Sequence, residues 1–386
     1  MSEAAARAPH GATRVAALDG LRGITILLVV LGHGTVYLWP ATAVLDVPYL
    51  RGFFLGGTVT VFFIVGGYVV TRGLVRELEA GVCDPLRFYL RRLLRLGPQL
   101  VLLCTALLLV DQVGPEPTRS AEQTRDSFLH VLTYTWNVYL QDHALDARGD
   151  LGHLWYLSVQ QQVYVVLPLF LALLIRRRAL SVLLLAAGIV SAVVLRFVLV
   201  PEIGWWPVSL RVLTRWDGLL LGVLLALVLP RVTRGLRWVP AALVVSLVAL
   251  VALILTAGES GELAFLRWWG LAVLVVSGAL VGLIVLHPGT GAIRALTAAP
   301  LTVLGRASYS IYVWHFPVFW FVGTQAQDWF WYARAMLALL IVVPIVVVME
   351  IFVERPVRRL LAERPFFRVR ADGTAPAPAG AERVAM

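Results

Sequence analysis

The chain has 386 residues, of which 59% are hydrophobic and 15% are charged, and its formal net charge is +10. A soluble domain is about 45–50% apolar and about 25% charged, so the excess of apolar residues is expected to face lipid or other helices. All 33 basic residues are arginines, which excludes a catalytic Schiff-base lysine or a P-loop lysine. The two cysteines, Cys83 and Cys104, are too few for a disulfide framework and lack metal-site spacing.

Ten apolar segments are each long enough to cross about 30 Å of hydrocarbon as a helix. They lie near residues 20–39, 52–71, 92–110, 153–175, 179–200, 212–230, 238–257, 268–286, 301–323 and 333–353. We therefore expect an all-α polytopic membrane protein of about ten transmembrane helices. Residues 1–16 would form an N-terminal tail, 17–360 the membrane domain, and 361–386 a largely disordered tail.

The arginines predict how these helices are oriented. If the N-terminus is cytoplasmic and the segments alternate, 24 arginines fall in inside segments and nine outside. Cytoplasmic loops of membrane proteins carry an excess of basic residues, so we expect both termini in the cytoplasm and the protein in the plasma membrane. The same rule explains the high isoelectric point without a nucleic-acid partner.

The first apolar segment contains polar residues that are costly inside a bilayer. Asp19 and Arg22 are three residues apart, so they are neighbours on one face of a helix. His33 follows Arg22 by close to three turns, on the same face and roughly 16 Å further along. Ionisable residues within a membrane are usually functional. The alternative is an interfacial arginine and a packed histidine.

Arg92 and Arg95, one turn apart, open the third apolar segment. One interpretation is that they flank a helix on its cytoplasmic side. The other is that they form an anion site, because a guanidinium matches the geometry of phosphate oxygens.

The fourth segment begins at His153, and its residues His153, Gln160 and Tyr164 recur at helical spacing. Ser158 lies between them. Three consecutive glutamines, from Gln160 to Gln162, are costly in a membrane unless they meet other helices or water.

Two later segments carry further polar candidates. Arg215 and Asp217 in the sixth form either a local ion pair or part of a site, and Gly222 would allow close helix packing there. The ninth segment carries a polar stripe at positions i, i+4 and i+7, formed by Ser308, Tyr312 and His315. This stripe is either part of a site or the result of aromatic packing near the membrane interface. His315 is expected at a depth similar to that of His33.

These segments together resemble the acyltransferase-3 family of membrane-bound acyltransferases. The matching motifs occur in order from Ala17 to about Leu360: LDGLRG with an Arg-x10-His pattern, VFFIVGGY, RRLLRLGP, HLWYLS, RWDG, SYSIYVWHFP and VERP. Two positions depart from the family pattern. Gln160, with Gln161, stands where glutamate is common, and Gly66 stands where serine is usual. We expect no fused extracytoplasmic hydrolase-like domain.

The resemblance implies an O-acyltransferase that moves an acyl group, expected to be acetyl, from acyl-CoA to a hydroxyl. The acceptor would be a sugar, a cell-envelope glycan, a lipid or a secondary metabolite, and no metal or permanently bound cofactor is expected. Arg22, Arg92 and Arg95 would hold the CoA phosphates, and Asp19 would orient Arg22. His33 would act as general base or be transiently acylated.

The remaining candidates would bind substrate, with Tyr312 or His315 stabilising the thioester oxyanion. They are His153, Ser158, Gln160, Tyr164, Arg215, Asp217, Ser308, Tyr312 and His315.

Two other classes of function stay open. A transporter or flippase also uses buried polar residues at mid-depth, although the sequence shows no inverted repeat. A catalytically inactive relative that only binds its ligand is favoured by Gln160. The exclusive use of arginine suggests a GC-rich bacterial genome.

Overall fold

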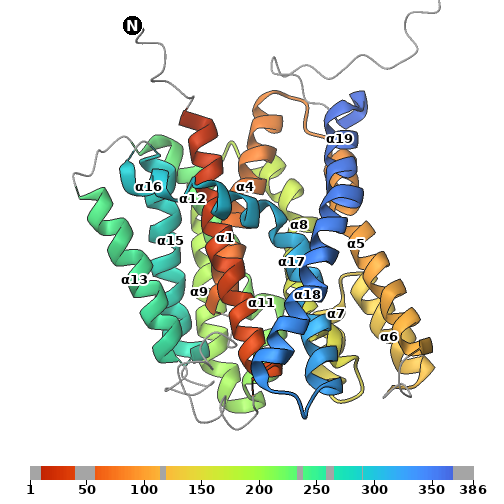
Figure 1. The fold of residues 1–386 in the computed structure, drawn as a ribbon. Coiled ribbons are helices and arrows are strands. Elements are labelled where there is room, and N and C mark those ends of the chain that lie inside the picture. Colours follow the sequence, from red (N-terminus) through yellow and green to blue (C-terminus); the bar gives the residue numbers. More distant parts are fainter. Residues whose placement is uncertain are drawn as a thin grey trace, which may run out of the picture.

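The computed structural model describes residues 10–39, 57–113, 119–232, 238–257, 265–288 and 290–367. Within these ranges the regular structure is entirely helical (Figure 1). The long helices are α1 (His10–Tyr37), α4 (Gly57–Glu79), α5 (Pro85–Val113), α8 (Trp155–Leu174), α9 (Arg178–Ile203), α12 (Asp217–Val228), α13 (Val239–Ala257), α15 (Gly270–Leu286), α17 (Ala299–Gln325) and α18 (Trp331–Met349).

Shorter helices connect or extend these. They are α6 (Ala121–Leu132), α7 (Trp136–Asp142), α10 (Trp205–Leu210), α11 (Val212–Arg215), α16 (Gly291–Ala295) and α19 (Arg355–Glu363). The 3₁₀ helices are η2 (Gly149–Leu154), η3 (Leu229–Arg231) and η6 (Pro365–Phe367), and the π-helices are η4 (Phe265–Trp269) and η5 (Glu350–Glu354). The first residues of the predicted C-terminal tail are thus helical. Residues 1–9 and 368–386 of the two predicted tails lie outside the described residues.

The prediction of an all-α polytopic membrane protein is confirmed. Eight helical spans in the described ranges are long and apolar enough to cross a membrane. The other two of the ten predicted segments correspond to α12 and α17. The sixth segment is broken into α11, α12 and η3, and only 12 residues of it form α12. α17 has 27 residues but carries Arg306 and the polar stripe within them.

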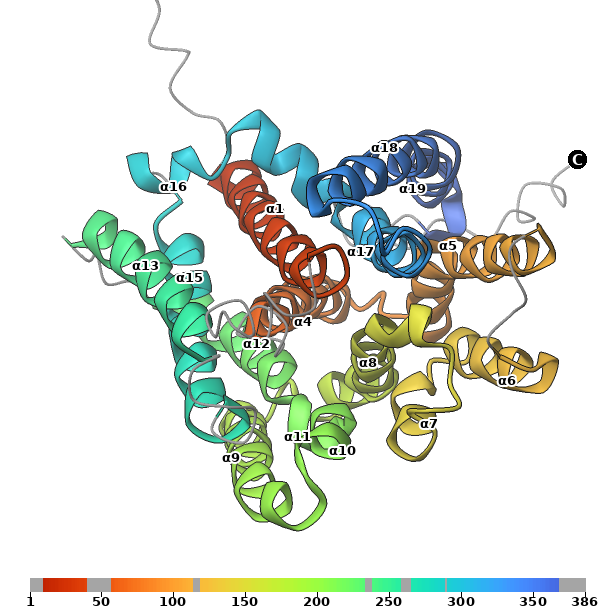
Figure 2. The same ribbon diagram turned by 60° about the horizontal axis from the view of Figure 1, so that its bottom comes forward.

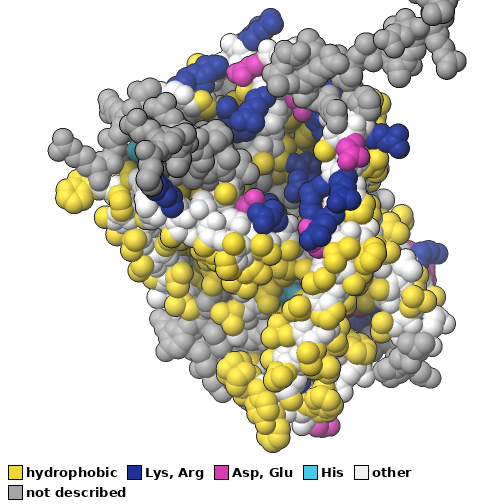
Figure 3. All heavy atoms as spheres, turned by 45° about the horizontal axis from the view of Figure 1, so that its top comes forward, with side chains coloured by type: hydrophobic (Ala, Val, Ile, Leu, Met, Phe, Trp, Pro, Cys, Tyr) yellow, Lys and Arg dark blue, Asp and Glu magenta, His cyan; other side chains and the backbone are white. Residues whose placement is uncertain are grey.

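The arginine side chains gather at the end of the bundle where α1 begins, and hydrophobic side chains cover the belt below it (Figure 3). Large apolar residues such as Leu183 on α9, Val245 on α13 and Leu340 on α18 are exposed. Exposed apolar residues over such a belt are what a lipid-facing surface requires. The side of the membrane on which the termini lie stays a prediction.

Close contacts at glycines bring the central helices together. α1 packs along α17, where a Cβ on Gly305 would overlap the carbonyl group of Asp19. α4 packs along α12 in the same way, and a Cβ on Gly222 would overlap the carbonyl group of Ile64. Small residues allow helix backbones to approach closely in membranes. Gly222 therefore has the packing role that its sequence position predicts. α1 and α4 lie toward the middle of the bundle, with α13 on one flank and α5 on another (Figure 2).

The α1–α17 contact can be tested by adding one methyl group. Gly305→Ala should lower the thermal unfolding temperature in detergent, because overpacking costs about 1–3 kcal/mol and the opposing atoms belong to a backbone. The control is Gly73→Ala on α4, where a Cβ would meet no atom within 4 Å. That variant should keep or slightly raise the unfolding temperature. Equal effects of both substitutions would contradict the proposed role of this contact.

Candidate active site

Two cavities lie along α1. The first, with a volume of about 140 Å³, is lined by residues of α1, α4, α5, α8 and α17. The second, with a volume of about 250 Å³, lies further along α1 and is lined by residues of α1, α7, α8, α10, α11 and α17 and of the segments η2 and η4. Small-molecule sites in proteins have volumes of about 300–1,000 Å³. Each cavity can therefore hold part of a substrate but not a whole one.

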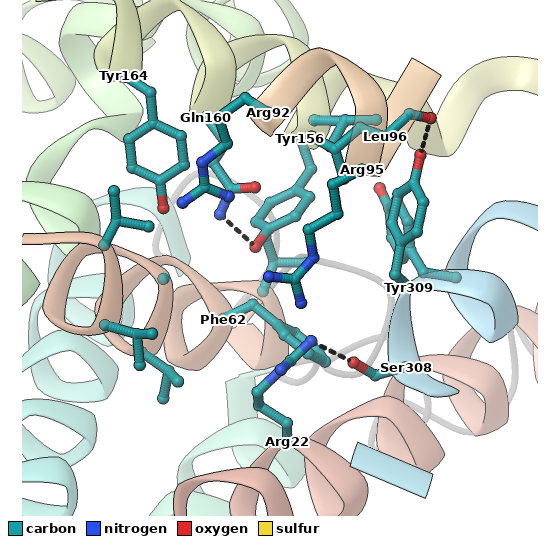
Figure 4. A pocket seen from close by; sticks show the side chains of 17 residues that line it. Arg22, Phe62, Arg92, Arg95, Leu96, Tyr156, Gln160, Tyr164, Ser308 and Tyr309 are labelled. Atoms are coloured by element: carbon teal, nitrogen blue, oxygen red, sulfur yellow. Dashed lines mark hydrogen bonds between the residues drawn. The ribbon is translucent and has the colours of Figure 1, made fainter. Parts of the chain in front are cut away.

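Three arginines line the first cavity, and their guanidinium groups converge there (Figure 4). Arg22 of α1 donates a hydrogen bond from Nη2 to Oγ of Ser308 on α17, at 2.8 Å. Its Nη1 lies 3.4 Å from Oδ1 of Asp19. Two helices thus fix the position of this guanidinium.

The other two arginines come from α5. The guanidinium of Arg92 lies 4.5 Å from the centroid of the Tyr164 ring, a cation–π distance. In the part of the chain that the structure describes, neither Arg92 nor Arg95 forms an ion pair. Of the three cations that line the cavity, only Arg22 is paired with a carboxylate, that of Asp19, among the described residues. Such a site favours an anion, and arginine forks suit phosphate oxygens.

The two positions that depart from the family pattern meet in this cavity. Gln160 donates from Nε2 to the Tyr156 hydroxyl at 3.2 Å. A Cβ on Gly66 would lie 2.7 Å from that Nε2 atom and 2.8 Å from the hydroxyl oxygen of Tyr164. A serine at position 66 would therefore require Gln160 or Tyr164 to move.

His33 lines the second cavity, and its imidazole is paired with that of His315 on α17. The Nδ1 atom of His33 lies 2.8 Å from Nε2 of His315. On its other side, Nδ1 of His315 lies 2.8 Å from the carbonyl oxygen of Ile311 and 3.0 Å from that of Tyr312. A carbonyl oxygen can only accept, so Nδ1 of His315 carries the proton and Nε2 accepts from His33. This assignment leaves the lone pair of His33 on Nε2, the arrangement of a general base.

Aromatic side chains connect the linings of the two cavities. Tyr312 lines the first cavity, and its hydroxyl donates to the carbonyl oxygen of His153, which lines the second. The ring of Tyr156 lies 5.5 Å from that of Tyr312.

The predicted site residues divide between these places. The first cavity is lined by Arg22, Arg92, Arg95, Gln160, Tyr164, Ser308 and Tyr312. The second is lined by His33, His153 and Arg215. Asp19 and His315 contact Arg22 and His33, respectively. Among the described residues, Ser158 and Asp217 line neither cavity.

The structure refines two interpretations from the sequence. His153 lies in η2, just before the first residue of α8, Trp155, and it lines the second cavity, whereas Gln160 and Tyr164 on α8 line the first. The alternative of a local ion pair between Arg215 and Asp217 is not found within the described residues. Asp217 accepts from Nη1 of the buried Arg196 at 2.7 Å, and Arg215 lies over the Trp155 ring.

Sequence reasoning missed most of the second cavity. Its walls include Tyr37, Arg148, Trp155, Trp205, Trp206 and Trp320. Trp205 and Trp206 form a dipeptide after a glycine, which was a usable signal of an aromatic site. Arg196 interrupts an apolar helix, and a buried arginine requires a partner.

Comparison with known proteins identifies the class of this fold and site. The family model described as an acyltransferase domain matches residues 15–351. The chain belongs to the acyltransferase-3 family of membrane-bound acyltransferases.

Two named relatives come from bacteria. The chain is 28% identical over 326 residues to O-acetyltransferase OatA of Staphylococcus aureus, covering 80% of this chain and 51% of that protein. It is 24% identical over 368 residues to peptidoglycan O-acetyltransferase OatA of Listeria monocytogenes, covering 89% of this chain and 56% of that protein. The chain thus spans about half the length of these relatives. No solved structure matches it significantly.

The pairing of the two histidines predicts that neutral His33 adopts its less common tautomer, with the proton on Nδ1. In protein labelled with ¹⁵N-histidine and reconstituted in nanodiscs, NMR should show His33 in the form protonated on Nδ1. Replacing the acceptor by His315→Phe should shift His33 toward the form protonated on Nε2, which a free imidazole favours. His315→Gln, whose amide oxygen can accept, should retain much of the original form.

The signal of His33 is assigned by its loss in His33→Ala. His143→Gln, at an exposed position, serves as control and should leave that signal unchanged. If His33 keeps its proton on Nδ1 in His315→Phe, His315 does not set its tautomer.

Proposed function

We propose that the protein is an O-acetyltransferase that moves an acetyl group from acetyl-CoA to a hydroxyl of an acceptor. The observation that carries this proposal is the placement of Arg22 and His33 on one helix. Arg22 belongs to a cavity with three arginines, and His33 belongs to the next cavity along α1. An extended CoA thioester has the same order of groups, with phosphates at one end and the reacting carbonyl at the other.

In this proposal the phosphates of the donor bind to Arg22, Arg92 and Arg95. The pantetheine arm then extends past Tyr156 and Tyr312 toward His33. Eleven residues separate Arg22 from His33, a rise of roughly 16 Å along a helix. The partly apolar lining of this route, which includes Phe62 and Val65, suits the uncharged arm of the donor.

The chemical step uses His33 as general base. Its Nε2 atom takes the proton of the acceptor hydroxyl while the hydroxyl oxygen attacks the thioester carbonyl carbon. The carbon–sulfur bond then breaks, and the thiolate of CoA leaves and takes up the proton from His33. Transient acylation of His33 is the alternative route.

The contacts of Tyr312 and His315 bear on their proposed role as oxyanion donors. The Tyr312 hydroxyl donates to the carbonyl oxygen of His153, and Nδ1 of His315 donates to backbone carbonyl oxygens. The hydroxyl hydrogen of Tyr312 and the Nδ1 hydrogen of His315 are thus already donated to backbone oxygens, and neither is available to an oxyanion without a rearrangement. We therefore propose that His315 acts mainly by orienting His33.

The relatives guide the choice of acceptor. Both are named O-acetyltransferases, and the name of the Listeria protein specifies peptidoglycan. We propose a cell-envelope glycan as acceptor and the plasma membrane as location. The inactive-relative alternative rests on Gln160, which lies in the arginine cavity and away from His33. A glutamine there leaves the proposed base in place.

Replacing the proposed base tests the chemistry. Membranes with His33→Ala should transfer label from radiolabelled acetyl-CoA to host envelope extracts about 10²–10⁴-fold more slowly than wild type, the usual contribution of a general base. His143→Gln, an exposed histidine, should match wild type. Undiminished transfer by a folded His33→Ala protein would remove His33 from the mechanism. Absence of transfer by wild type with every donor and extract would favour a transporter or a binding protein.

Replacing an arginine tests the donor site separately. Arg95→Gln should raise the KM for acetyl-CoA about tenfold with a smaller effect on kcat, because one charge-assisted phosphate contact is worth about 1.5–3 kcal/mol at most. The exposed Arg359→Gln is the matched control. A KM equal to that of the control would place the CoA phosphates elsewhere.

A further inference from the structure

The second cavity has walls suited to a ring with one apolar face. Trp155, Trp205, Trp206 and Trp320 line it together with Tyr37, and all five side chains are only partly buried. They come from four helices, α1, α8, α10 and α17. Aromatic side chains offer a large apolar surface with few conformations to lose, so they bind the C–H faces of sugar rings well.

The charge of this cavity is positive because one of its two arginines is not neutralised. Arg148 is held by Asp111 and by Asp150, the latter at 2.7 Å. Arg215 is only 6% exposed, and within the described ranges its side chain has neither an ion pair nor a hydrogen bond. Its guanidinium contacts the Trp155 ring, 5.3 Å from the centroid.

The nearest acidic group in the sequence compensates this charge only in part. Asp217 attracts the Arg215 cation, but it forms its ion pair with Arg196 at 2.7 Å and lines neither cavity. A buried charge without a hydrogen-bonded partner is costly. An anion bound in the cavity would supply that partner.

A second buried group in the same cavity also needs a partner. His153 is 3% exposed, and in the described part of the chain neither of its fully buried ring nitrogens forms a hydrogen bond, although the ring lies near the backbone of Tyr312 and Val313. Its ring stacks on Phe316, with centroids 4.6 Å apart. Buried polar groups are nearly always hydrogen-bonded, so a rotation of this ring toward the cavity would allow a ligand hydroxyl to supply the missing bond.

We infer that the second cavity binds the acceptor as a sugar that carries an anionic group, a phosphate or a carboxylate. Arg215 binds the anion, the tryptophans contact the ring, and His153 hydrogen-bonds a hydroxyl. This leaves another hydroxyl of the same ring to approach His33. The inference rests on the proposed function and names the chemistry of its acceptor.

Binding to the purified full-length protein in nanodiscs tests this inference through tryptophan fluorescence. The probes are N-acetylglucosamine, its 1-phosphate, N-acetylmuramic acid and inorganic phosphate. The two anionic sugars should bind at least tenfold more tightly than the neutral sugar. Arg215→Gln should abolish that preference, and Arg215→Lys should retain part of it. Arg211→Gln, an exposed arginine four residues away, should behave as wild type.

Two results would overturn the inference. Equal affinities for neutral and anionic sugars in wild type would show that Arg215 does not select an anion. Inorganic phosphate binding as tightly as the sugar phosphate would show that the tryptophans do not recognise the ring. Unfolding temperatures of the Arg215 variants separate these results from misfolding.

Acetyl transfer to the same probes separates this inference from the proposed function. If acetyl transfer depends on His33 but Arg215→Gln leaves the relative KM values of neutral and anionic sugars unchanged, only the inference fails. If the anionic sugars bind through Arg215 but no label leaves acetyl-CoA, the inferred specificity holds and the proposed acyl transfer fails.

Discussion

The close contact between α1 and α17 is the constraint on which both halves of the site depend. Glycines at positions such as Gly23 and Gly305 let the two backbones approach. Side chains on the same interface then meet directly, Arg22 with Ser308 at one end and His33 with His315 at the other. A wider separation would break both hydrogen bonds together. The packing of one helix pair therefore positions the proposed phosphate contact and the proposed base at once.

The departures at Gly66 and Gln160 are one local feature rather than two, because a Cβ at position 66 would reach the amide of Gln160. A glutamate at position 160 would add a negative charge beside the arginines of the first cavity. Glutamine keeps a hydrogen bond, here to Tyr156, and removes that charge. The cavity is then more positive, which favours a polyanionic donor. Because the His33–His315 pair belongs to the other cavity, this change alters the donor site more than the proposed base.

Periodicity predicted the helices, and the spacing within α1 correctly placed Arg22 and His33 on one side of it. Spacing along the fourth segment did not separate His153, which lines the second cavity, from Gln160 and Tyr164, which line the first. Spacing also left the partner of Asp217 open, because that partner, Arg196, lies on another helix. A pattern within one segment contains no information about partners from distant segments. The histidine pair joins residues 282 positions apart, so the sequence could suggest equal depth but not contact.

The division into two cavities has a chemical consequence for transfer. A thioester that reaches His33 is also exposed to hydrolysis if water enters with it, and aromatic rings at the boundary limit that entry. The Tyr312 hydroxyl, which is bonded to the backbone of His153, ties the lining of the first cavity to that of the second. The position of a residue in the proposed donor site is therefore fixed by the backbone of the proposed acceptor site.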